Sequence, residues 1–154
     1  MIRKATLGDV NAIQKLVNSH ADKGEMLPRS LGDICDNIRD FFIYEENGEM
    51  LGCCALHVTW VDLAEVRSLA VADDAQGRGV GTALMEACLD DARRLTVEKV
   101  FALTYKPEFF EKKGFQRVDK SELPHKVWLE CVKCIKFPDC DEVAVVRALE
   151  ISNE

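Results

Sequence analysis

Three glycines at alternate positions, Gly77, Gly79 and Gly81, form the part of this chain whose spacing best indicates a chemical task. They follow an apolar segment, residues 66–72, and they open an amphipathic one, residues 83–89. Where a strand turns through glycines into a helix, the first helical N–H groups lack partners and, with the helix dipole, form a binding site for anions. Glycine has no Cβ atom that would hold a phosphate away from these donors. The run therefore predicts a loop that binds a pyrophosphate group.

The spacing of these glycines excludes two common nucleotide-binding loops. A P-loop would place Gly-Lys-Ser or Gly-Lys-Thr after the glycines, and no such sequence follows here. The dinucleotide-binding pattern Gly-x-Gly-x-x-Gly fails because the glycines alternate and residue 82 is threonine. An ordinary glycine-rich turn is the remaining alternative.

The elements around this loop are expected to form an α/β or α+β domain with a mixed sheet. Helical spacing of apolar residues predicts a helix over residues 9–21, and Leu31, Ile34, Ile38 and Phe41 mark a second. Asn47-Gly48 is a strong signal for a hairpin turn. A third helix is expected to end near residue 95, and a short one to span residues 108–112. Strands are expected at residues 2–5, 41–46, 50–58, 66–71, 99–104, 115–118 and 142–149.

The composition restricts the classes of partner. The chain has 154 residues, a formal net charge of −7 and an isoelectric point near 5.0. Its length is typical of a single domain, taken as residues 1–154, and its acidity argues against nucleic acid or an anionic membrane surface as partners. Neither a membrane-spanning run nor a signal peptide is expected. Its seven cysteines are an odd number, scattered along the chain, which favours a reducing cytoplasm over a disulfide framework.

The glycine run also resembles a known signature. The spacing Gln-x-x-Gly-x-Gly at residues 76–81, preceded by Ser-Leu-Ala-Val at residues 68–71, resembles the acetyl-CoA signature of the GNAT superfamily of N-acetyltransferases. Residues 3–9 and 109–115 resemble the family's first strand with its helix cap and its later helix-to-strand segment. The resemblance extends over nearly the whole chain. It implies the GNAT fold, a mixed and mostly antiparallel sheet flanked by helices, and it implies acetyl-CoA as cosubstrate.

Four longer segments narrow the resemblance. Residues 26–30, 64–71, 123–128 and 134–142 are similar to the short, single-domain N-acetylglutamate synthases of arginine biosynthesis. This similarity implies acetylation of the α-amine of an amino acid, with L-glutamate as the expected small-molecule partner, by direct attack of the amine on the thioester. A homodimer is in keeping with the family. Within these 154 residues we do not expect the amino-acid-kinase-like domain through which long glutamate acetylators respond to arginine.

The resemblance assigns the cofactor mainly to backbone groups. Amides of the glycine loop hold the pyrophosphate, and the preceding strand pairs with the peptide-like pantetheine arm through Leu69 and Val71. The backbone N–H of Leu69 or Ala70 is the implied donor to the oxyanion. The side chain of Arg78 either adds charge at the phosphates or lies in solvent. The implied loop residues are Gln76, Gly77, Arg78, Gly79, Val80, Gly81 and Thr82.

An α-ammonium group must lose a proton before it can attack, so the reaction needs a base. Glu65, on the cofactor strand upstream of the loop, is the candidate; its alternative role is to pair with a neighbouring arginine or to face solvent. The family commonly uses a tyrosine as acid, but this chain has Phe110 at the matching position. Tyr105 or a water molecule is then the candidate acid, or the thiolate leaves unaided; otherwise Tyr105 is a core or rim aromatic. Of the histidines, His20 is interpreted as a packing residue and His57 is assigned no role.

Glutamate would bring two carboxylates into an acidic protein, so local cations must receive them. Arg29 lies between the first two helices, Arg67 lies on the cofactor strand, and Lys126 lies in a late segment. The guanidinium group suits the task because it binds a carboxylate with two parallel hydrogen bonds. Each of the three alone could be an ordinary surface cation, but their positions in three synthase-like segments favour the set.

No metal is assigned. Cys131, Cys134 and Cys140, with His125 nearby, are candidates for a structural zinc site that lack half of a paired Cys-x₂-Cys signature. Two other functions stay open. One is acetylation of a different amine, such as a polyamine, an antibiotic or a protein terminus. The other is a CoA-binding or metal-binding regulatory domain without turnover.

Overall fold

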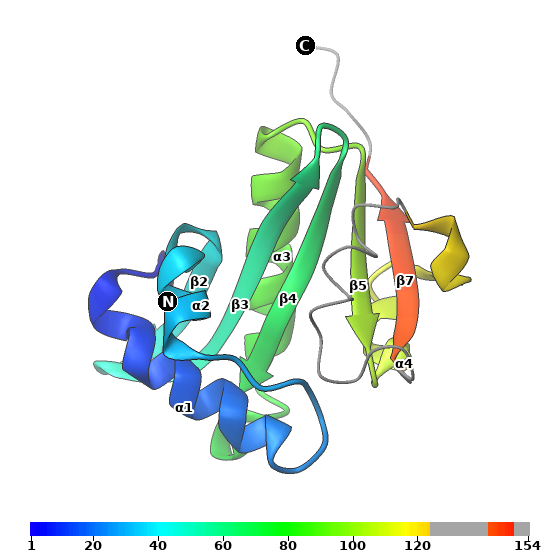
Figure 1. Ribbon diagram of the computed structural model, residues 1–154. Coiled ribbons are helices and arrows are strands. Elements are labelled where there is room, and N and C mark those ends of the chain that lie inside the picture. Colours follow the sequence, from blue (N-terminus) through cyan, green and yellow to red (C-terminus); the bar gives the residue numbers. More distant parts are fainter. Residues whose placement is uncertain (124–141, 150–154) are drawn as a thin grey trace.

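The computed structural model describes residues 1–123 and 142–149 of the chain (Figure 1). Within them the strands are β1 (Ile2–Lys4), β2 (Phe41–Glu46), β3 (Glu49–Trp60), β4 (Leu63–Val71), β5 (Lys99–Thr104), β6 (Gln116–Val118) and β7 (Val143–Ala148). They form one seven-stranded sheet in the order β1-β2-β3-β4-β5-β7-β6. Neighbours are antiparallel except β4 and β5, which are parallel. The expected mixed and mostly antiparallel sheet is thereby confirmed.

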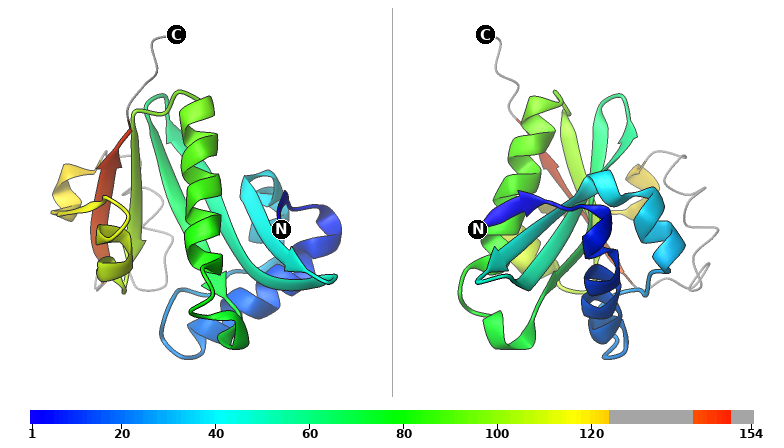
Figure 2. Two further views of the ribbon diagram at one scale, coloured as in Figure 1. Left: turned by 180° about the vertical axis from the view of Figure 1, so that it is seen from behind. Right: turned by 90° about the vertical axis from the view of Figure 1, so that its left-hand side faces the viewer.

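Helices cover both faces of this sheet. The front and back views show α1 (Val10–Ala21) and α2 (Leu31–Asp36) on one face and α3 (Val80–Arg94) on the other (Figures 1 and 2). The short α4 (Pro107–Glu111) packs into the same core cluster as α3. Single turns of 3₁₀ helix are η1 (Leu7–Asp9), η2 (Ile38–Asp40), η3 (Asp73–Ala75) and η4 (Lys120–Glu122). The observed order of strands and α-helices agrees with the order predicted from periodicity.

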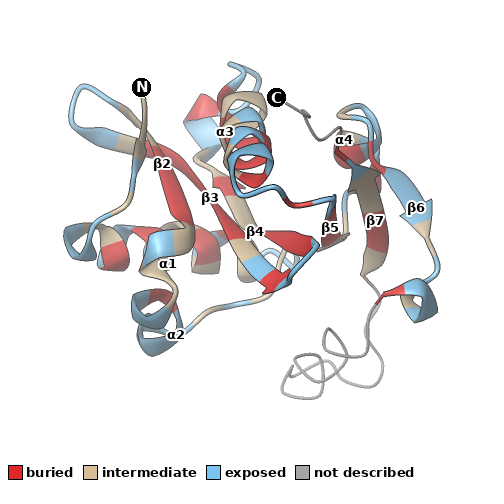
Figure 3. Cartoon of the chain, turned by 90° about the horizontal axis from the view of Figure 1, so that it is seen from above, coloured by how far each residue is buried: buried red, intermediate tan, exposed pale blue. Residues whose placement is uncertain are grey.

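Each helix is held by its apolar stripe. The buried residues of α1 recur at helical spacing, and those of α3 face the other side of the sheet, as the burial colours show (Figure 3). Gly52 of β3 lets α3 approach closely, because a Cβ atom there would lie 2.9 Å from side-chain carbons of both Val80 and Leu84. The buried residues of α1 are Val10, Ile13, Val17 and His20; those of α3 are Val80, Leu84, Met85, Cys88, Leu89 and Ala92.

The second helix is shorter than predicted. Apolar spacing from residue 31 to Phe41 indicated a single helix, but α2 ends at Asp36, and Phe41 is the first residue of β2, where it pairs with Ala55. Asn37 stops the helix: its side-chain Nδ2 donates to the backbone oxygen of Asp33 at 2.8 Å, and its own backbone leaves the helical region. A single 3₁₀ turn then leads into the strand.

The Asn47-Gly48 hairpin turn is confirmed, with both residues at positive φ, 54° and 77°. None of the helices in the described part of the chain combines the length and the apolarity that a membrane span requires.

Candidate active site

The two parallel strands at the centre of the sheet, β4 and β5, pair over only part of their length. β4 and β5 pair through Leu63–Lys99, Ala64–Val100 and Glu65–Phe101, and beyond these residues they diverge toward the open end of the sheet (Figure 1). β5 continues instead along β7, through six residue pairs from Lys99 to Thr104. A cleft of about 1150 Å³ opens where the strands diverge. Both candidate catalytic residues and the glycine loop line it.

A bulge in β4 accompanies this divergence. Ala55 of β3 lies opposite Arg67, and Cys53 lies opposite Ala70, so two steps along β3 match three along β4. The extra residue is Ser68, whose φ of 55° is unusual for a residue with a side chain. The bulge re-aims the strand after Arg67, and Leu69, Ala70 and Val71, the residues implied to hold the pantetheine arm and the oxyanion, all line the cleft.

The glycine loop closes one end of the cleft at the start of α3. Gly77 and Gly79 have φ values of 80° and 82°, and Gly79 is the N-cap residue of this 15-residue helix. A Cβ atom on either glycine would meet nothing within 4 Å, so these two positions need glycine for backbone conformation rather than for packing. The loop and the helix N-terminus present backbone donors toward the cleft, which fits a pyrophosphate group.

Two side chains of the loop have protein partners. The Arg78 guanidinium donates from Nη2 to Glu46 Oε2 at 2.8 Å, at an exposed position beside the β2–β3 turn. Arg78 does not line the cleft, so its side chain adds no contact there, while its backbone remains part of the loop. Gln76 Nε2 lies 3.4 Å from the backbone oxygen of Val71 and bridges the loop back to β4.

Arg29 is held in place from several directions. Its Nε donates to Asp33 Oδ2 at 2.7 Å, and its Nη1 donates to Ser68 Oγ at 2.8 Å. Its backbone N–H donates to Asn18 Oδ1 at 3.0 Å, and its guanidinium carbon lies 5.5 Å from the centre of the Phe41 ring. The side chain is 11% exposed and lines the cleft. Arg29 is therefore pre-organised rather than a mobile surface cation.

Glu65 and Arg67 lie on one face of β4, as their spacing predicted, and they form an ion pair. Arg67 Nε donates to Glu65 Oε1 at 2.6 Å, and the Glu65 side chain is 11% exposed. The pairing that was the alternative role of Glu65 therefore exists, but within the cleft rather than in solvent. Burial disfavours the ionised form of Asp33, yet hydrogen bonding and charge from Arg29, with charge from Arg67, lower its pKa on balance.

Tyr105 and Phe110 occupy the other wall of the cleft. Phe110 is buried, and its ring packs edge-on against Phe109 and Phe115 with centroid distances of 5.6 and 5.2 Å. It is a core residue that has no proton to donate. Tyr105 follows β5 directly and lines the same cleft.

His20 is buried as expected, but it does more than pack. Its Nδ1 lies 2.7 Å from Glu25 Oε2, and its Nε2 lies 2.8 Å from the backbone oxygen of Val71. The hydrogen bond from His20 is the main cause that lowers the pKa of Glu25. Across the cleft, Lys106 Nζ lies 3.7 Å from the same carboxylate oxygen. His20 thus joins the end of α1 and the loop that follows it to β4.

Several predicted residues lie outside the described part of the chain: Lys126, His125, Cys131, Cys134 and Cys140. Within residues 1–123 and 142–149, no group of three histidine, cysteine or carboxylate side chains is arranged to hold a metal ion. Reasoning from the sequence missed Asp33 and Asn37, which also line the cleft, and it assigned no role to His57, which lines it too. Only the register between β3 and β4 reveals that His57 lies opposite Glu65.

Known proteins share this architecture. A family model described as an acetyltransferase (GNAT) domain matches residues 37–117. An uncharacterized N-acetyltransferase of Chlorobaculum tepidum is 38% identical over 148 residues, which cover 96% of this chain and 96% of that protein. An amino-acid acetyltransferase of Mycobacterium tuberculosis is 35% identical over an alignment that covers 99% of this chain and 85% of that protein.

Solved structures agree. A Mycobacterium tuberculosis protein in complex with CoA and a second compound superposes with a TM-score of 0.84 at 30% identity, covering 97% of this chain and 99% of that one. N-acetylglutamate synthase from Neisseria gonorrhoeae, complexed with coenzyme A and N-acetyl-glutamate, superposes with a TM-score of 0.86 at 30% identity, covering 97% of this chain and 35% of that one. With the cleft, the glycine loop and a family match over more than half of the chain, these similarities lead to one conclusion. The chain belongs to the GNAT acetyltransferases and is an acyltransferase that uses acetyl-CoA.

Proposed function

We propose that the enzyme acetylates the α-amine of L-glutamate and that residues 1–154 act as one N-acetyltransferase domain in the cytoplasm. The observation that carries this proposal is the meeting of Arg29, Arg67 and Glu65 in one cleft whose other end is the glycine loop. An amino acid placed between them would have cations for its carboxylates, a base for its amine and a thioester within reach.

The two arginines suit a dicarboxylate. They come from different elements, and both act on the Asp33 carboxylate, whose pKa they lower against the effect of burial. A substrate carboxylate entering this region would be attracted by the positive charges of the same two arginines. Their guanidinium groups are suited to bidentate hydrogen bonding with it. The relatives named amino-acid acetyltransferase, and the Neisseria structure that contains N-acetyl-glutamate, support an acidic amino acid as acceptor.

Glu65 is the proposed base. Its carboxylate accepts a hydrogen bond from Arg67 within the cleft, and the ionised carboxylate is the form that can take a proton from the substrate ammonium. The deprotonated amine then attacks the thioester carbonyl, whose oxygen gains negative charge. A backbone N–H of Leu69 or Ala70, re-aimed by the Ser68 bulge, is the proposed donor to that oxygen.

The remaining roles fall to the opposite wall and to the loop. Tyr105, or a water molecule beside it, is the proposed proton donor to the departing sulfur, because Phe110 cannot serve. The loop from Gln76 to Thr82 holds the pyrophosphate through backbone N–H groups, and so fixes the thioester relative to Glu65.

Mass-spectrometric detection of products from acetyl-CoA tests the proposal, with a panel of L-glutamate, L-glutamine, L-aspartate, other amino acids, a polyamine and an amino-terminal peptide. We expect N-acetylglutamate as the dominant product at equal acceptor concentrations. Preferential acetylation of an uncharged or cationic acceptor would contradict the dicarboxylate assignment while leaving the acyltransferase in place.

A further inference from the structure

His57 lies directly across from the proposed base. In the antiparallel pair of β3 and β4, the Cα partner of His57 is Glu65. Directly opposed side chains on one face of such a pair have Cβ atoms about 5 Å apart. Both residues also line the cleft. A titratable imidazole therefore stands beside the carboxylate that must take a proton from the substrate.

Asp40 fixes the orientation of this imidazole. Its Oδ2 lies 2.7 Å from His57 Nδ1, and Asp40 itself is set by the single turn η2 just before β2. In a contact with an ionised carboxylate, Nδ1 carries a proton and donates it to the hydrogen bond. Nε2 is then the nitrogen that gains or loses a proton.

The chemistry needs such a group. When an α-ammonium becomes an amide, it loses two protons; one ends on the departing thiol and the other must reach solvent in every cycle. Glu65 is poorly placed to release a proton, because its side chain is 11% exposed and hydrogen-bonded to Arg67. The side chains of His57 and Asp40 are 24% and 25% exposed, so the route from Glu65 to His57 leads toward solvent.

We propose that His57, oriented by Asp40, is the proton-relay residue of this site. The O–H bond formed on Glu65 breaks, an N–H bond forms on His57 Nε2, directly or through one water, and the Glu65 carboxylate is restored. The imidazolium then loses that proton to water. Among the described residues, Asp40 from η2 contacts His57, and Glu65 from β4 lies opposite it in the sheet. Arg67 from β4 and Asp33 from α2 line the same cleft.

The relay rests on the proposed role of Glu65, and two variants separate it from a purely structural role. His57→Asn keeps a side-chain N–H for Asp40 but has no titratable nitrogen, whereas His57→Ala removes both. We expect kcat to fall about 100-fold in both variants, the size of a typical general acid–base contribution, with both KM values close to wild type. Added imidazole should restore turnover to His57→Ala in proportion to its neutral form.

Asp40→Asn should lower kcat less than either His57 variant, because the imidazole remains and only its orientation is loosened. Asp36→Asn is the matched control, because it removes a carboxylate from the neighbouring helix end at an exposed position and should leave kcat unchanged. Thermal unfolding of each variant confirms that the chain is folded.

If His57→Asn kept the kcat of the wild type, the relay proposal would be wrong, and the contact between His57 and Asp40 would have only a structural role. A folded His57→Ala that imidazole does not restore would also show the relay proposal to be wrong. The identity of the wild-type product tests the substrate separately. If another amine proves to be the acceptor, the same variants, assayed with that amine, still decide whether His57 relays the proton.

Discussion

The guanidinium of Arg29 donates a hydrogen bond to the hydroxyl oxygen of Ser68 at 2.8 Å. This contact joins the loop after α1 to Ser68, the one residue of β4 with a positive φ. The residue expected to receive the substrate carboxylate is therefore anchored on the bulge that shapes the cleft. If Arg29 binds the acceptor as proposed, this contact couples acceptor recognition to the geometry of β4.

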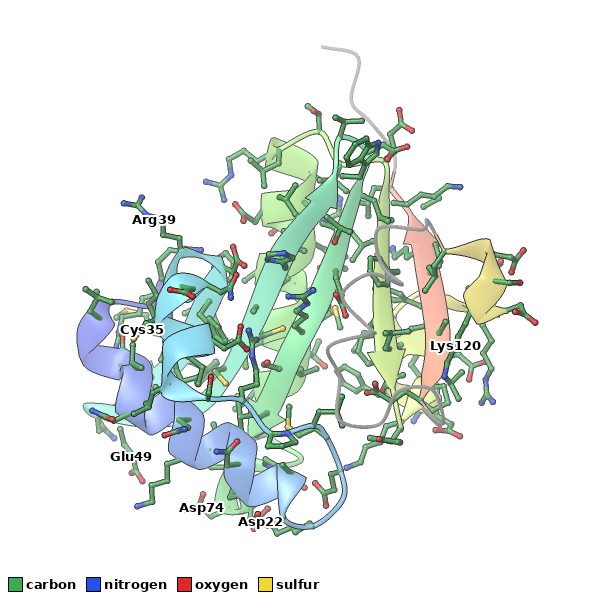
Figure 4. All side chains as sticks on the ribbon, viewed as in Figure 1. Asp22, Cys35, Arg39, Glu49, Asp74 and Lys120 are labelled. Atoms are coloured by element: carbon green, nitrogen blue, oxygen red, sulfur yellow. The ribbon has the colours of Figure 1, made fainter. Side chains whose placement is uncertain are left out.

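Arg29→Ala should raise the KM for glutamate about 10-fold or more while the KM for acetyl-CoA stays near wild type, because a hydrogen bond to a charged group contributes about 1.5–3 kcal/mol. Initial rates with each substrate varied in turn measure both constants. Arg39→Ala is the control: Arg39 projects outward from the edge of the helical layer, so its loss should change neither constant (Figure 4). An unaltered glutamate KM in Arg29→Ala would remove this arginine from the acceptor site.

Glu65→Gln should lower kcat about 100-fold or more, because the amide keeps the shape of the side chain but cannot take the substrate proton. The acidic limb of the pH–rate profile should disappear with it. Steady-state rates across the pH range measure both effects. A variant that keeps the wild-type profile would show that the base lies elsewhere.

Gly79→Ala should weaken acetyl-CoA binding, because a Cβ at a φ of 82° strains the loop that presents the pyrophosphate donors. Gly48→Ala is a matched control in the β2–β3 hairpin: its φ is 77°, and its added Cβ would also meet open space. Both variants should lose about 1–2 kcal/mol of stability, but only Gly79→Ala should raise the KM for acetyl-CoA. Calorimetry of CoA binding gives the comparison directly, and equal CoA affinities would argue against the loop as the pyrophosphate site.

The ion pair at the start of the chain makes stability depend on pH. Arg3 donates to both carboxylate oxygens of Asp9, at 2.8 and 2.9 Å, and this hydrogen bonding is the main cause that lowers the pKa of Asp9 from 3.8 to about 2. Because the pKa is depressed in the folded state, the stabilisation is present above about pH 4 and is lost as the pH falls through about 2. Asp9→Asn should therefore cost about 1–2 kcal/mol at neutral pH, and the deficit should shrink over that acidic window.

Denaturant unfolding of Asp9→Asn at neutral and acidic pH checks this dependence. Asp74→Asn removes an exposed carboxylate and should show no such pH-dependent deficit. A constant difference between wild type and Asp9→Asn across the acidic range would assign the effect to something other than the ion pair.

The local elements could be predicted because their signals are local. Apolar residues repeat with the helical period in α1 and α3, and Gly79 provides the positive φ that begins α3. The end of α2 was missed because the Asn37 side chain competes for the backbone of Asp33, while apolar spacing continued to Phe41. The periodicity of apolar residues does not show where a polar side chain ends a helix by bonding to its backbone.

The parts of the site that escaped prediction depend on distant partners. Ser68 has a positive φ without being glycine, so nothing in its residue type signals the bulge. His20 bonds to a backbone oxygen 51 residues away, and His57 contacts a carboxylate 17 residues away. Arg29 and Arg67 could be named as cations, but their shared effect on Asp33 needed the folded chain.

The limited pairing of β4 with β5 also affects the local stability of the fold. Along β4 and β5, three residue pairs join the β1–β4 half of the sheet to the β5–β7 half. A pantetheine arm lying along β4 would add amide hydrogen bonds to that strand where β5 no longer pairs with it. Binding of the cosubstrate would then stabilise the fold against local unfolding. Hydrogen exchange of the backbone amides in both β4 and β5 should therefore slow together when CoA binds. The complex with the cosubstrate would then resist local unfolding more than the free enzyme does.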